Sequence, residues 1–247
     1  MRRGKVWIVG AGPGDPELIT VKGLRLLREA DVIVYDRLVH PSLLGEARRD
    51  AELIYVGKAP GRHTMTQDEI NKLLVEKALE GKMVVRLKGG DPYVFGRGEE
   101  ECVYVLEHGV ECEVVPGVTS ATAVPAYAGI PVTSRWYASS FAVVTGMEAA
   151  EKERPRVDYA RIASAVDTIV VLMGVSRLHY ITARMLEARG RETPAAIIEK
   201  GTLPDQRVIV STLGDIAVRA EEAGVKPPAV LVVGDVVKLR ERLWKLS

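Results

Sequence analysis

The sequence is poor in cysteine and histidine, the residues that build disulfide scaffolds and metal sites. Only 2 of its 247 residues are cysteine and 4 are histidine. Cys102 and Cys112 stand among apolar residues, on a predicted helix and strand, and we expect both to be reduced packing residues. The histidines are widely scattered and have no metal-ligand spacing, so the sequence predicts no metal site.

Net charge and long apolar runs are also lacking. Lysine and arginine number 34 against 33 acidic residues, a formal charge of +1. No global field therefore draws the chain to nucleic acid or to an anionic membrane, and an anionic ligand needs a local basic cluster. The N-terminal apolar run, 6–9, is too short for a signal peptide, and no later run approaches the ~18 residues of a membrane span. We expect a cytoplasmic protein.

Apolar residues make up 47% of the chain, enough for substantial cores. Short β-rich runs alternate with helical patterns, which indicates parallel-sheet α/β architecture. The sequence predicts two α/β domains, 1–132 and 133–247, joined near 129–136. Strands are expected at 6–9, 32–35, 53–56, 83–87 and 112–115 in the first domain and at 141–144, 168–173, 195–198, 207–211 and 229–233 in the second. One helix is predicted to open with a capping box from Thr66 to Glu69.

The segment 86–99, RLKGGDPYVFGRGE, follows the apolar run 83–85 and holds four glycines. Glycine lets a backbone come close to a neighbour or a ligand, and a simple tight turn needs neither this many glycines nor the interleaved Arg86, Lys88 and Arg97. We interpret this loop as the wall of a binding pocket.

A second glycine loop, VGAGPGDP at 9–16, follows the first predicted strand. A dinucleotide site needs G-x-G-x-x-G, but Asp15 stands where the third glycine should be and would repel a pyrophosphate. Pro13 also removes one backbone donor. The loop therefore disfavours a nicotinamide site and fits a ligand with little negative charge.

Charged residues follow two other predicted strands. Asp36 comes directly after 32–35, and Lys58 follows 53–56. Each alone is typical of a helix cap or a solvated surface residue. Both stand at the carboxyl ends of strands, where open α/β sheets bind ligands. As a pair they fit acid/base chemistry as well as they fit these structural roles.

The motifs VGAGPGDPELIT (9–20), VYDRLV (34–39), YVGK (55–58), VVRLKGGDPYVFGRGEEE (84–101), VVPGVTSA (114–121), LMG (172–174) and EKGT (199–202) occur in an order and at a spacing that resemble the tetrapyrrole methylase family. The resemblance covers about residues 5–243. It implies a homodimer of two-domain α/β subunits, with the active-site cleft between the domains of each subunit. It also implies S-adenosylmethionine as methyl donor, S-adenosylhomocysteine as product, and transfer of two methyl groups to uroporphyrinogen III. The product, precorrin-2, leads to sirohaem or cobalamin.

Carried over by motif, the resemblance implies a proton acceptor at Asp36 and a proton donor at Lys58. The donor site falls on Pro13, Gly89, Gly90, Asp91, Val94, Thr119, Ser120, Met173 and Gly201. The substrate is a polycarboxylate, and planar guanidinium groups suit bidentate carboxylate capture. Among the basic residues in or beside the loops, which include Arg86 and Lys88, we expect Arg37, Arg97 and Arg135 to bind it.

Two departures from the family pattern stand out. Glu99, Glu100 and Glu101 follow Gly98 directly, and we expect these acids to favour the start of a helix through its dipole. Ser134 replaces the family's usual histidine, which removes one possible substrate contact.

Three alternatives stay open on the sequence: a methylase of a later corrin precursor, an NAD-dependent oxidoreductase, and a non-catalytic donor-binding sensor.

Overall fold

The computed structural model describes residues 4–57, 65–147 and 156–244. It divides into two compact units, Met1–Thr119 and Ser120–Ser247. The sequence placed the domain boundary at residues 132 and 133. The second unit begins earlier because the helix α5 (Ser120–Tyr127) packs against two strands of the second sheet. Across the described ranges, no helix is long and apolar enough to span a bilayer.

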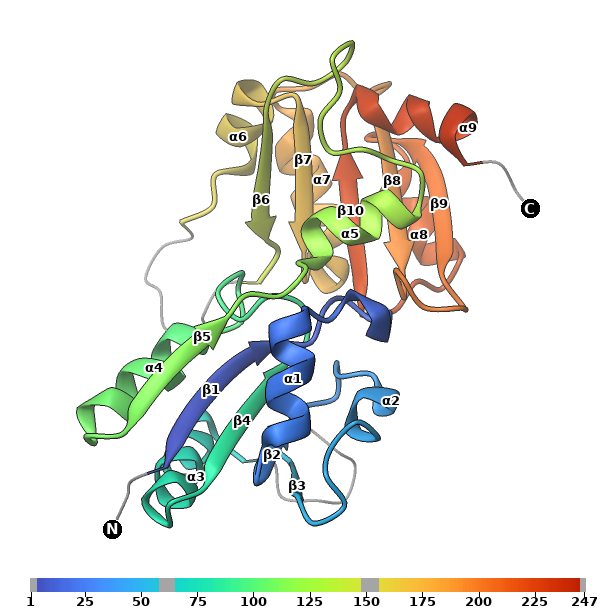
Figure 1. Cartoon of the computed structure of the whole chain (residues 1–247). Coiled ribbons are helices and arrows are strands. Elements are labelled where there is room, and N and C mark those ends of the chain that lie inside the picture. Colours follow the sequence, from blue (N-terminus) through green and yellow to red (C-terminus); the bar gives the residue numbers. More distant parts are fainter. Residues whose placement is uncertain (1–3, 58–64, 148–155, 245–247) are drawn as a thin grey trace. The chain divides into compact units, whose positions relative to one another are not determined.

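The first unit is a five-stranded parallel sheet in the order β3-β2-β4-β1-β5 (Figure 1). Its parallel pairing confirms the predicted architecture. The elements are β1 (Lys5–Gly10), the 3-10 turn η1 (Pro16–Leu18), α1 (Val21–Glu29), β2 (Val32–Tyr35), α2 (Pro41–Leu44), β3 (Glu52–Tyr55), α3 (Gln67–Leu79), β4 (Met83–Lys88), α4 (Gly98–Glu107) and β5 (Glu111–Val115).

Helices cover both faces of this sheet because its central strands alternate between two apolar cores. In β4, Val84 packs with α3 and α4, whereas Val85 and Leu87 pack with α1 and α2. The predicted capping box opens α3: the Thr66 hydroxyl accepts from the Glu69 backbone amide, and the Glu69 carboxylate accepts from the Thr66 amide. This cap fixes where the helix begins.

The second unit holds a five-stranded sheet in the order β6-β7-β10-β8-β9 (Figure 1). After α5 come β6 (Phe141–Thr145), α6 (Tyr159–Ala165), β7 (Thr168–Leu172), the 3-10 turn η2 (Val175–Arg177), α7 (Leu178–Leu186), β8 (Pro194–Glu199), β9 (Arg207–Thr212), α8 (Ile216–Glu222), β10 (Ala229–Val233), the 3-10 turn η3 (Asp235–Leu239) and α9 (Arg240–Leu243).

The expectation of a parallel sheet is wrong for this unit. Only β6 and β7 are parallel, and β10 pairs antiparallel with both β7 and β8. The strands β8 and β9 are joined by the short segment 200–206, which carries no crossover helix. Such a connection forms an antiparallel hairpin, so the pairing of β8 with β9 is antiparallel.

The expectation of two reduced cysteines is also wrong. Cys102 on α4 and Cys112 on β5 are joined by a disulfide, with their Cα atoms 5.7 Å apart. The turn between α4 and β5 folds the strand back beside the helix, which brings two cysteines only ten positions apart in sequence into bonding range.

Candidate active site

Four glycines lie backbone against backbone where β1, β4 and β5 end. Gly12 and Gly90 exchange two backbone hydrogen bonds, of 3.3 and 2.6 Å. A Cβ added to Gly10 would lie 2.5 Å from Gly117 Cα and 2.7 Å from Gly90 O. Glycine at positions 10 and 117 is therefore required by the packing of the loops themselves.

Close packing also explains the glycine at position 89, because a Cβ there would lie 2.6 Å from Leu38 Cβ. Gly90 has a φ of 67°, in the left-handed region that glycine adopts without strain. The glycines of the predicted pocket wall thus bring the loop close to its neighbours in the first unit. Pro13 directly follows Gly12, which forms the bridge with Gly90.

The Asp91 carboxylate organises the same loop. Its Oδ1 accepts from the backbone amides of Tyr93 (2.8 Å) and Val94 (3.2 Å), and its Oδ2 accepts from the Gly117 amide (3.0 Å). Bonds from amides to an ionised carboxylate are among the stronger hydrogen bonds in proteins. Asp91 therefore ties the loop after β4 to the end of β5. Its predicted contact with a methyl donor stays a prediction.

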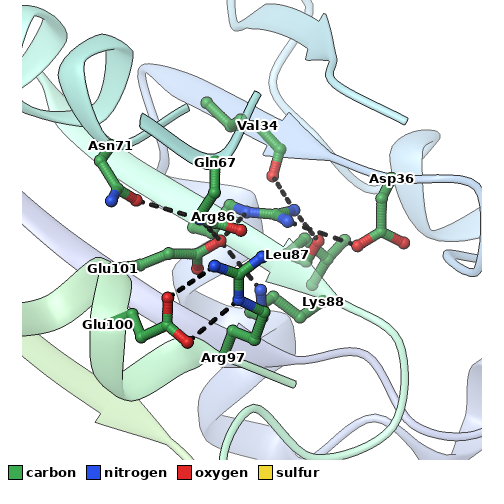
Figure 2. A network of polar contacts seen from close by, with 10 residues as sticks. All are labelled: Val34, Asp36, Gln67, Asn71, Arg86, Leu87, Lys88, Arg97, Glu100 and Glu101. Atoms are coloured by element: carbon green, nitrogen blue, oxygen red, sulfur yellow. Dashed lines mark hydrogen bonds and ion pairs between the residues drawn. The ribbon is translucent and has the colours of Figure 1, made fainter. Parts of the chain in front are cut away.

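Asp36 lies at the carboxyl end of β2, one strand away from this loop. Its Oδ1 accepts from the Leu38 amide at 3.0 Å, and its Oδ2 lies 3.4 Å from Arg86 Nη2. The two side chains meet because Val34 of β2 is in register with Arg86 of β4. Figure 2 shows the guanidinium reaching from the strand toward the Asp36 carboxylate.

Arg86 continues into a buried network centred on Glu101 of α4 (Figure 2). One Glu101 oxygen, Oε1, accepts from Arg86 Nε (3.2 Å), Lys88 Nζ (2.9 Å) and Gln67 Nε2 (3.1 Å). Glu101 is 0% exposed, and its other oxygen, Oε2, has no hydrogen-bond partner among the described residues. Glu101, Arg86 and Lys88 are buried together, and Asp36 pairs with Arg86 at the partly exposed end of the network.

The buried surroundings of Lys88 oppose its positive charge. Burial, together with the neighbouring Arg86 guanidinium, lowers the pKa of the Lys88 ammonium despite its ion pair with Glu101. The basic residues Arg86 and Lys88, which the sequence placed in the loop cluster, are thus turned into the first unit, where both are buried and paired.

The role expected for Glu101 at the helix start is corrected by this burial. The sequence held a signal for it: the buried positions of α4 are 98, 101, 102 and 105, the spacing of one helix face. Glu101 falls on that face, whereas Glu99 and Glu100 are exposed and lie in the first turn, as expected.

The three arginines predicted to bind substrate are all exposed. Arg97 has a φ of 59° and holds Glu100 through two hydrogen bonds, of 3.0 and 2.7 Å, which keep the pKa of the Glu100 carboxyl below its ordinary value. Arg37 stands next to Asp36, and Arg135 lies in the turn closed by the Ser134–Ala138 bridge. Lys58 lies outside the described residues. The roles of all four stay predictions.

In the second unit, Met173 and Gly201 lie at one edge of the sheet. They follow β7 and β8, which run the same way because both pair antiparallel with β10. Met173 is 45% exposed with a φ of 55°, and Gly201 lies between two further residues with positive φ, Lys200 and Thr202. Such conformations cost about 1–3 kcal/mol each and cluster at ligand sites. Ser120 opens α5 and Thr119 ends the first unit.

One sheet is parallel and the other is mixed, and the motif residues of the described chain stand at the strand ends of both. The family model "Tetrapyrrole (Corrin/Porphyrin) Methylases" matches residues 5–217, and the chain belongs to this family. The fold class predicted from the sequence is confirmed.

Individual relatives within this family show which of its members the chain resembles in sequence. A uroporphyrinogen-III C-methyltransferase from Methanocaldococcus jannaschii is 57% identical over 238 residues, 96% of this chain and 98% of the relative. An S-adenosyl-L-methionine-dependent uroporphyrinogen III methyltransferase from Methanosarcina barkeri is 55% identical, over 97% of this chain and 94% of the relative. The crystal structure of a Thermus thermophilus uroporphyrin-III C-methyl transferase complexed with S-adenyl homocysteine is 43% identical. It matches with a TM-score of 0.81, over 96% of this chain and 94% of that one.

Proposed function

We propose that this chain transfers two methyl groups from S-adenosylmethionine to carbon atoms of uroporphyrinogen III and so forms precorrin-2. The relatives above support both the reaction and the donor, through their names and through the product bound in one structure. The observation that carries the proposal is the position of Asp36. It stands at the carboxyl end of β2, paired with Arg86, in the sheet whose neighbouring strand ends carry the glycine loops.

For this methyl transfer the protein has two main tasks: it positions the two reactants and it accepts a proton. A methyl sulfonium carries an excellent leaving group, so the rate depends on holding the methyl group in line with the attacking pyrrole carbon. The pyrrole ring system gains a positive charge with the methyl group and must then release a proton from another of its atoms to become neutral again. A carboxylate suits this step as the proton acceptor, and the Leu38 amide and Arg86 hold the Asp36 carboxylate in place.

The remaining parts of the site belong to the same proposal. The loop after β4 and the edge of the second sheet that carries Met173 and Gly201 bind the donor, and Arg37, Arg97 and Arg135 hold substrate carboxylates. Lys58 returns a proton. The enzyme works as a homodimer in the cytoplasm, and its product is used for sirohaem or cobalamin.

Mass analysis of the tetrapyrrole after incubation with uroporphyrinogen III and S-adenosylmethionine tests the proposal. We expect a gain of two methyl groups. A tetrapyrrole of unchanged mass would contradict the proposal. Methylation of a later corrin precursor alone would then assign the chain to the sibling reaction, and donor binding without any transfer would indicate a sensor.

A further inference from the structure

The buried carboxylate of Glu101 has no place in the proposed reaction, yet it is the centre of the most densely bonded polar cluster in the described part of the first unit. Its Oε1 accepts three hydrogen bonds, and the side chain is fully excluded from solvent. Replacing such an ionic cluster with apolar residues of similar size is often neutral or stabilising, so stability alone is a weak reason for it.

Among the described residues, Arg86 is the hydrogen-bonded link between this cluster and Asp36. Arg86 donates from Nε to Glu101 Oε1, from Nη1 to Leu87 O (3.0 Å), and from Nη2 toward Asp36 Oδ2. Each guanidinium nitrogen thus has a fixed direction. With Asp36 Oδ1 held by the Leu38 amide, the orientation of the Asp36 carboxylate depends on where the guanidinium is held. Glu101 is the charged anchor of that guanidinium, beside the carbonyls of Leu87 and Val34.

Glu101 also neutralises the Lys88 ammonium. This ammonium lies 2.9 Å from Glu101 Oε1, and Asp36 and Glu100 are further acidic residues that act on its charge. Without the Glu101 carboxylate, Lys88 would lose its ion-pair partner, and Asp36, which already pairs with Arg86, would attract both cations. Lys88 would then draw Asp36 away from the direction that Arg86 gives it.

We propose that Glu101 is a positioning residue for the reaction: it anchors Arg86 and occupies Lys88, so that the Asp36 carboxylate is held in the orientation that accepts the proton. This inference rests on the proposed role of Asp36 and deepens it. Glu101 itself contacts neither substrate nor donor.

The test is a double-mutant cycle between Glu101→Gln and Asp36→Asn, measured by steady-state kinetics. In the wild-type background we expect Glu101→Gln to lower kcat at least about tenfold, because a misplacement of about 1 Å can cost 100-fold. KM for the porphyrinogen and Kd for S-adenosylhomocysteine should stay within about twofold. In the Asp36→Asn background the same change should lower kcat by less than about twofold, because its target is already lost.

The matched control is Glu99→Gln. Glu99 is exposed in the same first turn of α4, so this variant removes an equal charge from the same helix end without touching the network. Its kcat should remain within about twofold of the wild type. A charge-balanced variant, Lys88→Met with Glu101→Gln, covers the case in which Glu101→Gln does not fold. We expect it to keep the kcat loss of at least about tenfold, because Arg86 still lacks its charged anchor.

Several results would overturn the inference: a wild-type kcat in Glu101→Gln or in the charge-balanced variant, equal losses in both backgrounds, or a loss carried by KM. The failure of the proposed function is a separate result, because it shows in the wild-type protein as a porphyrinogen that gains no methyl group.

Discussion

The two sheets treat buried charge at their carboxyl edges differently. In the first, Glu101 is buried with two cations that are themselves buried, Arg86 and Lys88. In the second, the buried carboxylate Glu199 pairs with Arg207, whose side chain is 50% exposed, and accepts from the Lys226 amide at 3.0 Å. The Glu101 cluster holds its charged groups in fixed directions away from water, which suits it to orient a reacting side chain. The Glu199–Arg207 pair is an ordinary ion pair at a strand end that water reaches.

The largest expected effect on stability comes from removing the buried carboxylate of each sheet, Glu101 in the first and Glu199 in the second. Glu101→Ala leaves two buried cations without their carboxylate and should lower the free energy of unfolding by about 3–5 kcal/mol. Glu199→Ala leaves a cation that water already reaches and an amide donor, and should cost about 1–3 kcal/mol. Urea unfolding of both variants measures the difference. Equal losses, or a larger loss for Glu199→Ala, would show that the two edges do not differ in this way.

The next effect concerns the disulfide, which belongs to the first unit alone. It closes a loop with a sequence separation of 10, for which chain entropy predicts a stabilisation of about 2–3 kcal/mol. Replacing Cys102 and Cys112 together by serine should lower the free energy of unfolding by that amount, and reductant should destabilise the wild type but not this variant. Two titratable thiols in the unfolded, unreduced wild type would contradict the bond.

The smallest effect is a pH dependence in the second unit. Burial alone would raise the pKa of Glu199, but the Lys226 amide and Arg207 overcome it and hold that pKa below its ordinary value of 4.5. Stability from this carboxylate is therefore fully present above pH 4.5 and is lost as the pH falls through the folded-state pKa. The difference in unfolding free energy between the wild type and Glu199→Gln should shrink between pH 7 and pH 3. A difference that is constant or grows toward acid would refute the assignment.

Much of the fold could be predicted from local patterns. The predicted strand 83–87 and the capping box of α3 match the structure because apolar runs and caps are properties of neighbouring residues. The strand β4 runs one residue further, through Lys88, because a partner distant in sequence neutralises that charge. The antiparallel pairing of β10 and the disulfide were missed because both depend on which elements become neighbours in space.

In the site, too, local sequence predicts some features, and contacts between residues distant in sequence decide the others. Asp36 and Asp91 could be placed at strand ends from the order of apolar and polar residues. The contact of Asp36 with Arg86 could not, because it depends on the register of β2 against β4. The sequence predicts only a helix-start role for Glu101, because three acids in a row obscure the one that falls on the buried face of α4.

The central claim is that proton transfer depends on the charged cluster around Asp36 at the carboxyl edge of the first sheet. Single-turnover methylation of uroporphyrinogen III by Asp36→Asn tests it most directly, with S-adenosylhomocysteine affinity measured by calorimetry on the same preparation. We predict a rate at least about 100-fold below the wild type, with the affinity changed by less than about twofold. A rate within tenfold of the wild type, or a loss of affinity as large as the loss of rate, would contradict the claim.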